Sequence, residues 1–151
     1  VGCSNDAHEL AKNDSSGIGL KSAIETAQAD SQDATPPDVI FSGSSCTQRD
    51  DELEQNALRS VFPQSCAKQT STRGVMGISM GVSGMYDLIV AVRALQDGQL
   101  PVPGNPAKIY DKMASDIVGA DSNQIGKKDR VLINSIGVNG LYGAIQIRGA
   151  Q

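Results

Sequence analysis

The chain has 151 residues, a mass of 15.8 kDa and a formal net charge of −4, from 13 basic and 17 acidic residues. Hydrophobic residues make up 39% and charged residues 20%, which favours one folded domain, or half of a larger one, over disorder. The acidic balance excludes a basic surface for nucleic acid. No apolar run approaches the roughly 20 residues that span a bilayer, so we expect no integral membrane protein.

The three cysteines, Cys3, Cys46 and Cys66, are odd in number and irregularly spaced, so they do not indicate a disulfide framework. Neither a CxxC pair nor a second histidine beside His8 is present, and we expect no metal site. This cysteine usage favours a reducing cytoplasm. Because the chain begins at Val1, its N terminus has been processed or trimmed, or the chain is a piece of a longer protein.

The first half of the chain shows two helix patterns around a short strand. The polar residues 14–16 predict the start of a helix, because apolar residues at helical spacing follow them. The apolar run 39–41 predicts a buried strand, and the small-residue loop 42–47 after it is a favourable place for a site. The acidic pair 50–51 predicts the first turn of a second helix, which Pro63 ends.

The second half alternates longer elements with glycine-rich and proline-rich connections. The expected elements are an extended piece at 70–76, a long helix from 77 to 96, a mostly loop region at 99–129, and strands at 131–133 and 144–147 joined by a turn at 137–140. Together with the first half, this order predicts an α/β layered domain with a mixed sheet.

No single motif indicates a chemistry by itself. The glycines 137–143 lie between two expected strands, which indicates a turn rather than a phosphate-binding loop. Cys46 follows a strand and is the best-placed nucleophile, but the sole histidine, His8, lies near the terminus in a polar stretch. A catalytic cysteine is therefore disfavoured, and the acidic pair 50–51 is better explained by helix capping than by acid–base catalysis.

Five segments carry a resemblance to a known family. In chain order they are GCSNDAH at 2–8, the helix that begins near 17, VIFSGSSCT at 39–47 with Asp51 and Glu54 after it, STRGVMGI at 71–78 with Gly81 and Gly84 after it, and NSIGVNG at 134–140. Together they resemble the C-terminal half of a β-ketoacyl-carrier-protein synthase, of the thiolase-fold family. The resemblance implies that residues 1–151 form the C-terminal half of a layered α-β-α-β-α fold whose N-terminal half lies outside this chain.

The resemblance also places the positions where the chain departs from active ketosynthases. Two histidines of the family would fall at Gly43 and Ile78, and the lysine before the second falls at Arg73. The family's catalytic cysteine belongs to the N-terminal half, and His8 matches a loop histidine outside the catalytic pair. In the condensation, loss of CO2 from a malonyl thioester leaves an enolate whose oxygen the two histidines stabilise. Removing one such donor costs on the order of 10²–10³ in rate.

Because it lacks both imidazoles, the chain resembles the chain length factor, or ketosynthase-β subunit, of type II polyketide synthases. The resemblance implies a non-catalytic subunit with no cofactor and no metal, which pairs with an active ketosynthase-α subunit and helps shape the tunnel for the growing chain. An acyl carrier protein would be served through the complex. It also implies that glycines 77, 81 and 84 let the central helix approach its pseudo-symmetric partner, and that Ile136 and Val138 replace two gating phenylalanines.

Two rival interpretations stay open at this point. One is a divergent, active β-ketoacyl synthase or malonyl decarboxylase, an acyltransferase in which the hydroxyls of Ser44 and Ser45 replace the histidines. The other is a plain α/β binding module unrelated to polyketides, which the ordered segments disfavour.

Overall fold

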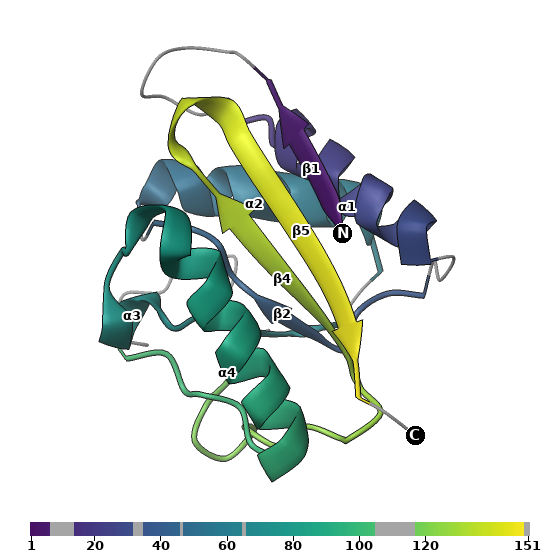
Figure 1. The fold of residues 1–151 in the computed structure, drawn as a ribbon, viewed down its shortest axis with the longest axis vertical. Coiled ribbons are helices and arrows are strands. Elements are labelled where there is room, and N and C mark those ends of the chain that lie inside the picture. Colours follow the sequence, from purple (N-terminus) through teal and green to yellow (C-terminus); the bar gives the residue numbers. More distant parts are fainter. Residues whose placement is uncertain (7–13, 32–34, 46, 65, 105–116, 150–151) are drawn as a thin grey trace.

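The computed structural model describes residues 1–6, 14–31, 35–45, 47–64, 66–104 and 117–149. Its strands are β1 (Gly2–Asn5), β2 (Val39–Phe41), β3 (Lys68–Thr70), β4 (Arg130–Ile136) and β5 (Leu141–Arg148). Within the described residues they form one five-stranded mixed sheet in the order β1-β5-β4-β2-β3 (Figure 1). β2 is parallel to β3 and β4, whereas β5 is antiparallel to β4 and β1. The expected α/β class with a mixed sheet is confirmed.

Helices cover both faces of this sheet. α1 (Ile18–Ser31) and α2 (Gln48–Val61) lie behind it in Figure 1, and α4 (Ser83–Asp97) crosses in front. The central strand β2 alternates between two cores, because Ile40 packs with α1 and α2 while Val39 and Phe41 pack with α4. All three side chains are buried, as expected of a parallel strand covered on both faces.

The two helices of the first half are confirmed. In α2 the cap is Thr47, whose hydroxyl accepts a hydrogen bond from the backbone N–H of Asp50 at 3.2 Å. Asp50 and Asp51 lie in the first turn and Arg59 in the last, which complements the helix dipole. The helix ends at Val61, just before Pro63, as the sequence predicts.

The long helix expected from residue 77 was wrong at its start. A short helix, α3 (Arg73–Met76), ends at Gly77, whose φ of 69° lies in the left-handed region. A 3-10 turn, η1 (Met80–Val82), follows, and Met80 also has a positive φ, of 50°. α4 therefore begins only at Ser83. The expected extended piece at 70–76 is helical from Arg73 onward.

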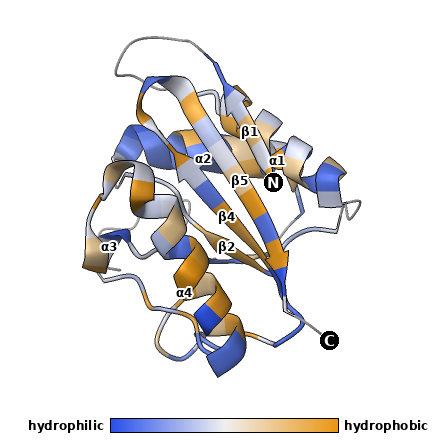
Figure 2. Ribbon diagram, in the orientation of Figure 1, coloured by the Kyte–Doolittle hydropathy of each residue, from blue (hydrophilic) through white to orange (hydrophobic). Residues whose placement is uncertain are grey.

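The C-terminal hairpin is confirmed and is longer than expected. β4 and β5 pair from Arg130 with Arg148 up to Ile136 with Tyr142. A 3-10 turn, η3 (Val138–Gly140), joins them, and Asn139 adopts a left-handed φ of 64° there. Figure 2 shows apolar residues along α4 and alternating polar and apolar residues along β5.

Among the described residues, no helix is both long and apolar enough to cross a membrane.

Candidate functional site

The structure brings Gly43, Arg73 and Ile78 to one pocket. Because β2, β3 and β4 are parallel, their C-terminal ends meet at one edge of the sheet, where sites in α/β folds form. The loop after β2, the α3–η1 segment and the turn after β4 surround a pocket of about 250 Å³, which Ser135 and Val138 also line. Three segments far apart in sequence therefore build one site.

Gly43 lies against the backbone of β4. A Cβ at this position would lie 2.5 Å from the carbonyl oxygen of Asn134 and 2.9 Å from the backbone nitrogen of Ser135. Side-chain carbons essentially never approach other atoms closer than 3.0 Å, and here the neighbouring atoms are main chain. Position 43 is therefore a point of backbone contact, with no room for any side chain unless a strand moves.

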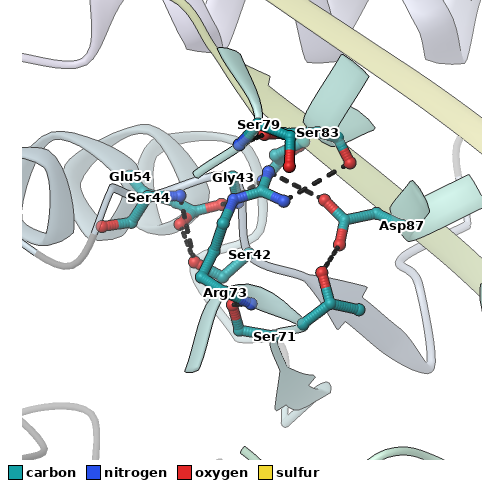
Figure 3. Close-up of polar contacts among 11 residues, drawn as sticks. Ser42, Gly43, Ser44, Glu54, Ser71, Arg73, Ser79, Ser83 and Asp87 are labelled. Atoms are coloured by element: carbon teal, nitrogen blue, oxygen red, sulfur yellow. Dashed lines mark hydrogen bonds and ion pairs between the residues drawn. The ribbon is translucent and has the colours of Figure 1, made fainter. Parts of the chain in front are cut away.

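A buried carboxylate holds this contact in place (Figure 3). Glu54 of α2 is fully buried and accepts hydrogen bonds from the Gly43 N–H at 3.1 Å, from Asn134 Nδ2 at 2.8 Å and from the Ser42 hydroxyl. Burial raises the pKa of Glu54 above its usual value of 4.5, and the three donors partly offset this. Glu54 thus ties α2, the loop after β2 and β4 together next to Gly43, which lines the pocket.

A second buried cluster holds Arg73. Its guanidinium Nη2 lies 2.8 Å from Asp87 Oδ2, and Nη1 donates to the Ser83 carbonyl at 3.4 Å (Figure 3). The Thr72 hydroxyl donates to the other Asp87 oxygen at 2.6 Å. Burial raises the pKa of Asp87, while Thr72 and Arg73 act in the opposite direction. The charge of Arg73 is therefore balanced inside the protein and does not face the pocket uncompensated.

Asp87 was missed by the sequence analysis. It lies on the buried face of α4 with Ala91 and Ala94, and an acid on a buried helix face signals a hidden partner. That signal was available, but the partner Arg73 precedes it by a short helix and a turn whose path the sequence did not reveal.

The rim of the pocket is apolar. Ile78 and Met80 are 55% and 77% exposed, and Val138 and Leu141 are also exposed. Ile136 is partly buried against the α1–α2 core and also lines the pocket. No described residue that lines the pocket is a histidine or a cysteine.

The two serines of the rival catalytic interpretation are both engaged with acids. Ser44 donates to Asp51, and Ser45 donates to Asp50, through short hydrogen bonds. Ser45 and Asp50 line the pocket, which adds a negative charge to its wall. Hydroxyls that donate to carboxylates are poorly placed to stabilise a developing anion.

Other candidates lie elsewhere. His8 and Cys46 fall outside the described residues. Cys3 and Cys66 are free, exposed thiols. Within the described ranges, no cluster of three or more histidine, cysteine or acidic residues is arranged to hold a metal ion.

Comparison with known proteins matches residues 1–105 to the family described as Beta-ketoacyl synthase, C-terminal domain. One curated relative is the 3-oxoacyl-[acyl-carrier-protein] synthase 2 of Coxiella burnetii, which is 25% identical over 147 residues, covering 95% of this chain and 35% of that protein. The chain thus spans about a third of the length of this relative.

Solved structures share the fold. The ishigamide ketosynthase/chain length factor superimposes with a TM-score of 0.86 at 21% identity, over 99% of this chain and 37% of that one. A ketosynthase in complex with its chain length factor from Xenorhabdus doucetiae gives 0.85 at 20% identity, over 99% and 38%. With the family match extending over more than half of its length, the chain belongs to the β-ketoacyl synthase C-terminal domain family.

Proposed function

We propose that this chain is the C-terminal half of a non-catalytic ketosynthase-like subunit of the chain length factor kind. Such a subunit pairs with an active ketosynthase and helps shape the tunnel for a growing acyl or polyketide chain. The observation that carries the proposal is the backbone contact at Gly43, because a Cβ would collide with the Asn134 main chain at the position that the resemblance assigns to a family histidine. The departure is thus built into the fold rather than confined to one side chain.

The electrostatics of the pocket support the same conclusion. Stabilising an enolate requires hydrogen-bond donors or positive charge directed at the developing anion. Arg73 already serves Asp87 and the Ser83 carbonyl, while Asp50 contributes an acidic group to the wall. Ile78 offers only hydrocarbon. A pocket with an acidic group and, among its described residues, no free donor of positive charge stabilises neither the malonyl carboxylate nor the enolate left after CO2 is lost.

The exposed face of α4 supports a covering N-terminal half. Five large apolar residues lie exposed from Val82, the residue just before this helix, along the helix itself, and we call them the α4 outer stripe: Val82, Met85, Tyr86, Ile89 and Val92. A contiguous apolar patch marks a surface that another protein part covers. The chain covers only 35% of the curated relative and 37% of the ishigamide ketosynthase/chain length factor chain, so the remaining length of such proteins is enough for an N-terminal half.

The proposed partners follow from the names of the similar proteins. Two of the matching structures are ketosynthases with a chain length factor, and the curated relative acts with an acyl carrier protein. We therefore assign an active ketosynthase as the direct partner of this subunit and a carrier protein as a partner of the complex. The role in setting product length rests on the same comparison.

A reconstituted complex tests the proposal. The complete subunit containing this chain is combined with its ketosynthase and a loaded carrier protein, and chain elongation is measured. We expect Ser45→Ala to leave the elongation rate unchanged, whereas replacing the partner's catalytic cysteine abolishes elongation. Gel filtration verifies assembly of each variant. Loss of elongation on Ser45→Ala with the complex intact would show that this subunit is itself an active synthase.

A further inference from the structure

A second pocket lies at the far end of α2 from the candidate site. It has a volume of about 210 Å³ and is bounded by Ile40 of β2, Leu58 of α2 and Phe62 just after that helix. α2 is about 20 Å long; its first turn borders the candidate site, whereas its second half borders this pocket. The second pocket thus lies on the α1–α2 side of the sheet, apart from the groups discussed above.

Two buried amides form the polar part of this pocket. Gln55 of α2 and Gln69 of β3 are both more than nine-tenths buried, and Gln55 Nε2 donates to Gln69 Oε1 at 3.0 Å. Among the described residues, Gln55 Oε1 and Gln69 Nε2 have no hydrogen-bond partner, and both glutamines line the pocket. The pocket wall therefore carries one available acceptor and one available donor, the two groups that an amide needs.

The guanidinium of Arg59 places a positive charge at the same pocket. Arg59 is exposed in the last turn of α2 and lines the pocket, and among the described residues it has no carboxylate partner. This is notable in a chain of net charge −4. The pocket thus brings together apolar side chains, two buried glutamines and a guanidinium that attracts a carboxylate.

The size of the pocket favours a protein segment over a small molecule. Small-molecule sites usually enclose about 300–1,000 Å³, more than this pocket holds. An apolar side chain with its adjoining backbone amide is a smaller occupant and matches both the cavity and the two glutamines. We propose that the pocket anchors a peptide segment of a partner protein, in which an apolar side chain enters the cavity, its amide pairs with Gln55 and Gln69, and a neighbouring carboxylate contacts Arg59.

The exposed thiol of Cys66 gives a local readout, since it precedes Ala67, which lines the pocket. The complete subunit in its complex is alkylated in the presence of the capped dipeptide N-acetyl-leucyl-aspartyl amide, and the rates at Cys66 and Cys3 are followed by mass spectrometry. The structure predicts saturable slowing at Cys66 and none at Cys3. N-acetyl-leucyl-lysyl amide should bind about two- to fivefold more weakly, the range for a contact with one exposed charge.

Charge reversal gives the decisive comparison. In Arg59→Glu the preference should invert, so that the lysyl probe protects Cys66 better than the aspartyl probe. Lys128→Glu makes the same change of charge at another exposed cation and should leave the preference as it is. The double variant Gln55→Leu/Gln69→Leu should lose protection by both probes. Equal slowing at both cysteines, or an unchanged preference in Arg59→Glu, would overturn the proposal without bearing on the catalytic status of the subunit.

Discussion

At the scale of single residues, Gly43 and Glu54 together determine where the loop after β2 lies against β4. Glu54 draws the Gly43 N–H and the Asn134 amide to one carboxylate, so the loop after β2 closes onto β4. That closure removes the space a Cβ would need at Gly43. A side chain at position 43 would therefore require the loop after β2 to move away from β4.

Adding one carbon at this position tests the contact. Gly43→Ala is expected to lower the free energy of unfolding of the complete protein by about 1–3 kcal/mol, because the Asn134 main chain has to move. Gly119→Ala is the matched control, since a Cβ there meets only Ser122 Oγ at an ordinary 3.6 Å. Thermal and denaturant unfolding compare the two. Equal stability of both variants would mean that the loop is free to shift.

The buried Glu54 carboxyl predicts a pH dependence. Burial raises its pKa in the folded state above 4.5, so the unfolded chain ionises first as the pH rises. This group therefore contributes stability below about pH 4.5 that is lost as the pH climbs through its folded pKa. Gln cannot ionise, so the stability of Glu54→Gln relative to the parent should increase above pH 4.5 and then level off. Parallel pH profiles of the two proteins would contradict this.

At the scale of elements, the Arg73–Asp87 ion pair connects α3 to α4 across a strained turn. Gly77 and Met80 both have positive φ between the two helices. The Ser79 N–H donates to the Ser83 hydroxyl at 2.9 Å, which positions the first residue of α4. The ion pair and this hydrogen bond together fix the segment that carries Ile78 to the pocket rim.

Breaking the pair on one side should be costly. Asp87→Leu leaves the Arg73 guanidinium buried without its partner, and we expect a loss of about 3–5 kcal/mol in unfolding free energy. The double variant Arg73→Met/Asp87→Leu removes both charges and should recover most of that loss. Denaturant unfolding of the three proteins measures the difference. If the double variant were no more stable than Asp87→Leu, the unpaired charge of Arg73 would not be the cause of the lost stability.

The elements were predictable where local signals agreed. The apolar run at β2, the acidic first turn of α2 and Pro63 after it each have a direct physical cause, and their elements were found. The polar strand β3, Lys68–Thr70, was missed because its residues carry no alternation of apolar side chains and its burial comes from parallel pairing with β2. Such pairing is a tertiary effect that a three-residue pattern does not reveal.

The sequence pointed to residues of the candidate site but not to the contacts that these residues make. The resemblance assigned Gly43, Arg73 and Ile78 to the family's catalytic positions, and these three residues line one pocket. The sequence suggested an empty histidine position at Gly43, whereas the structure fills that space with the β4 backbone. Contacts between a loop and a strand some 90 residues later in the chain depend on packing that no local pattern encodes.

At the scale of the whole molecule, the α4 outer stripe and the pocket rim expose apolar side chains on the same side of the sheet, from Ile78 and Met80 to Ile89. Covering this surface requires close approach to the α3–η1–α4 segment. Gly81 is the informative position there. A Cβ at Gly81 meets no atom within 4 Å in this chain, and its φ is not in the left-handed region.

The effect of Gly81→Ala therefore depends on what covers it. In the absence of a covering part, alanine should be neutral or slightly stabilising, since it favours helical backbone by up to about 1 kcal/mol over glycine. If an N-terminal half packs closely on this segment, the same change should destabilise the complete protein by about 1–3 kcal/mol. We expect the second result in thermal unfolding. Neutrality of Gly81→Ala in the complete protein would argue against close packing at this glycine.

The most direct test is release of CO2 from a malonyl-loaded carrier protein by the complex when the partner ketosynthase has lost its catalytic cysteine and histidines. Under these conditions the subunit containing this chain is the sole source of decarboxylation. We expect a rate no higher than that of the carrier protein alone. A rate clearly above that background, reduced by Arg73→Met while the complex stays assembled, would show that this pocket stabilises the enolate and that the subunit is catalytic.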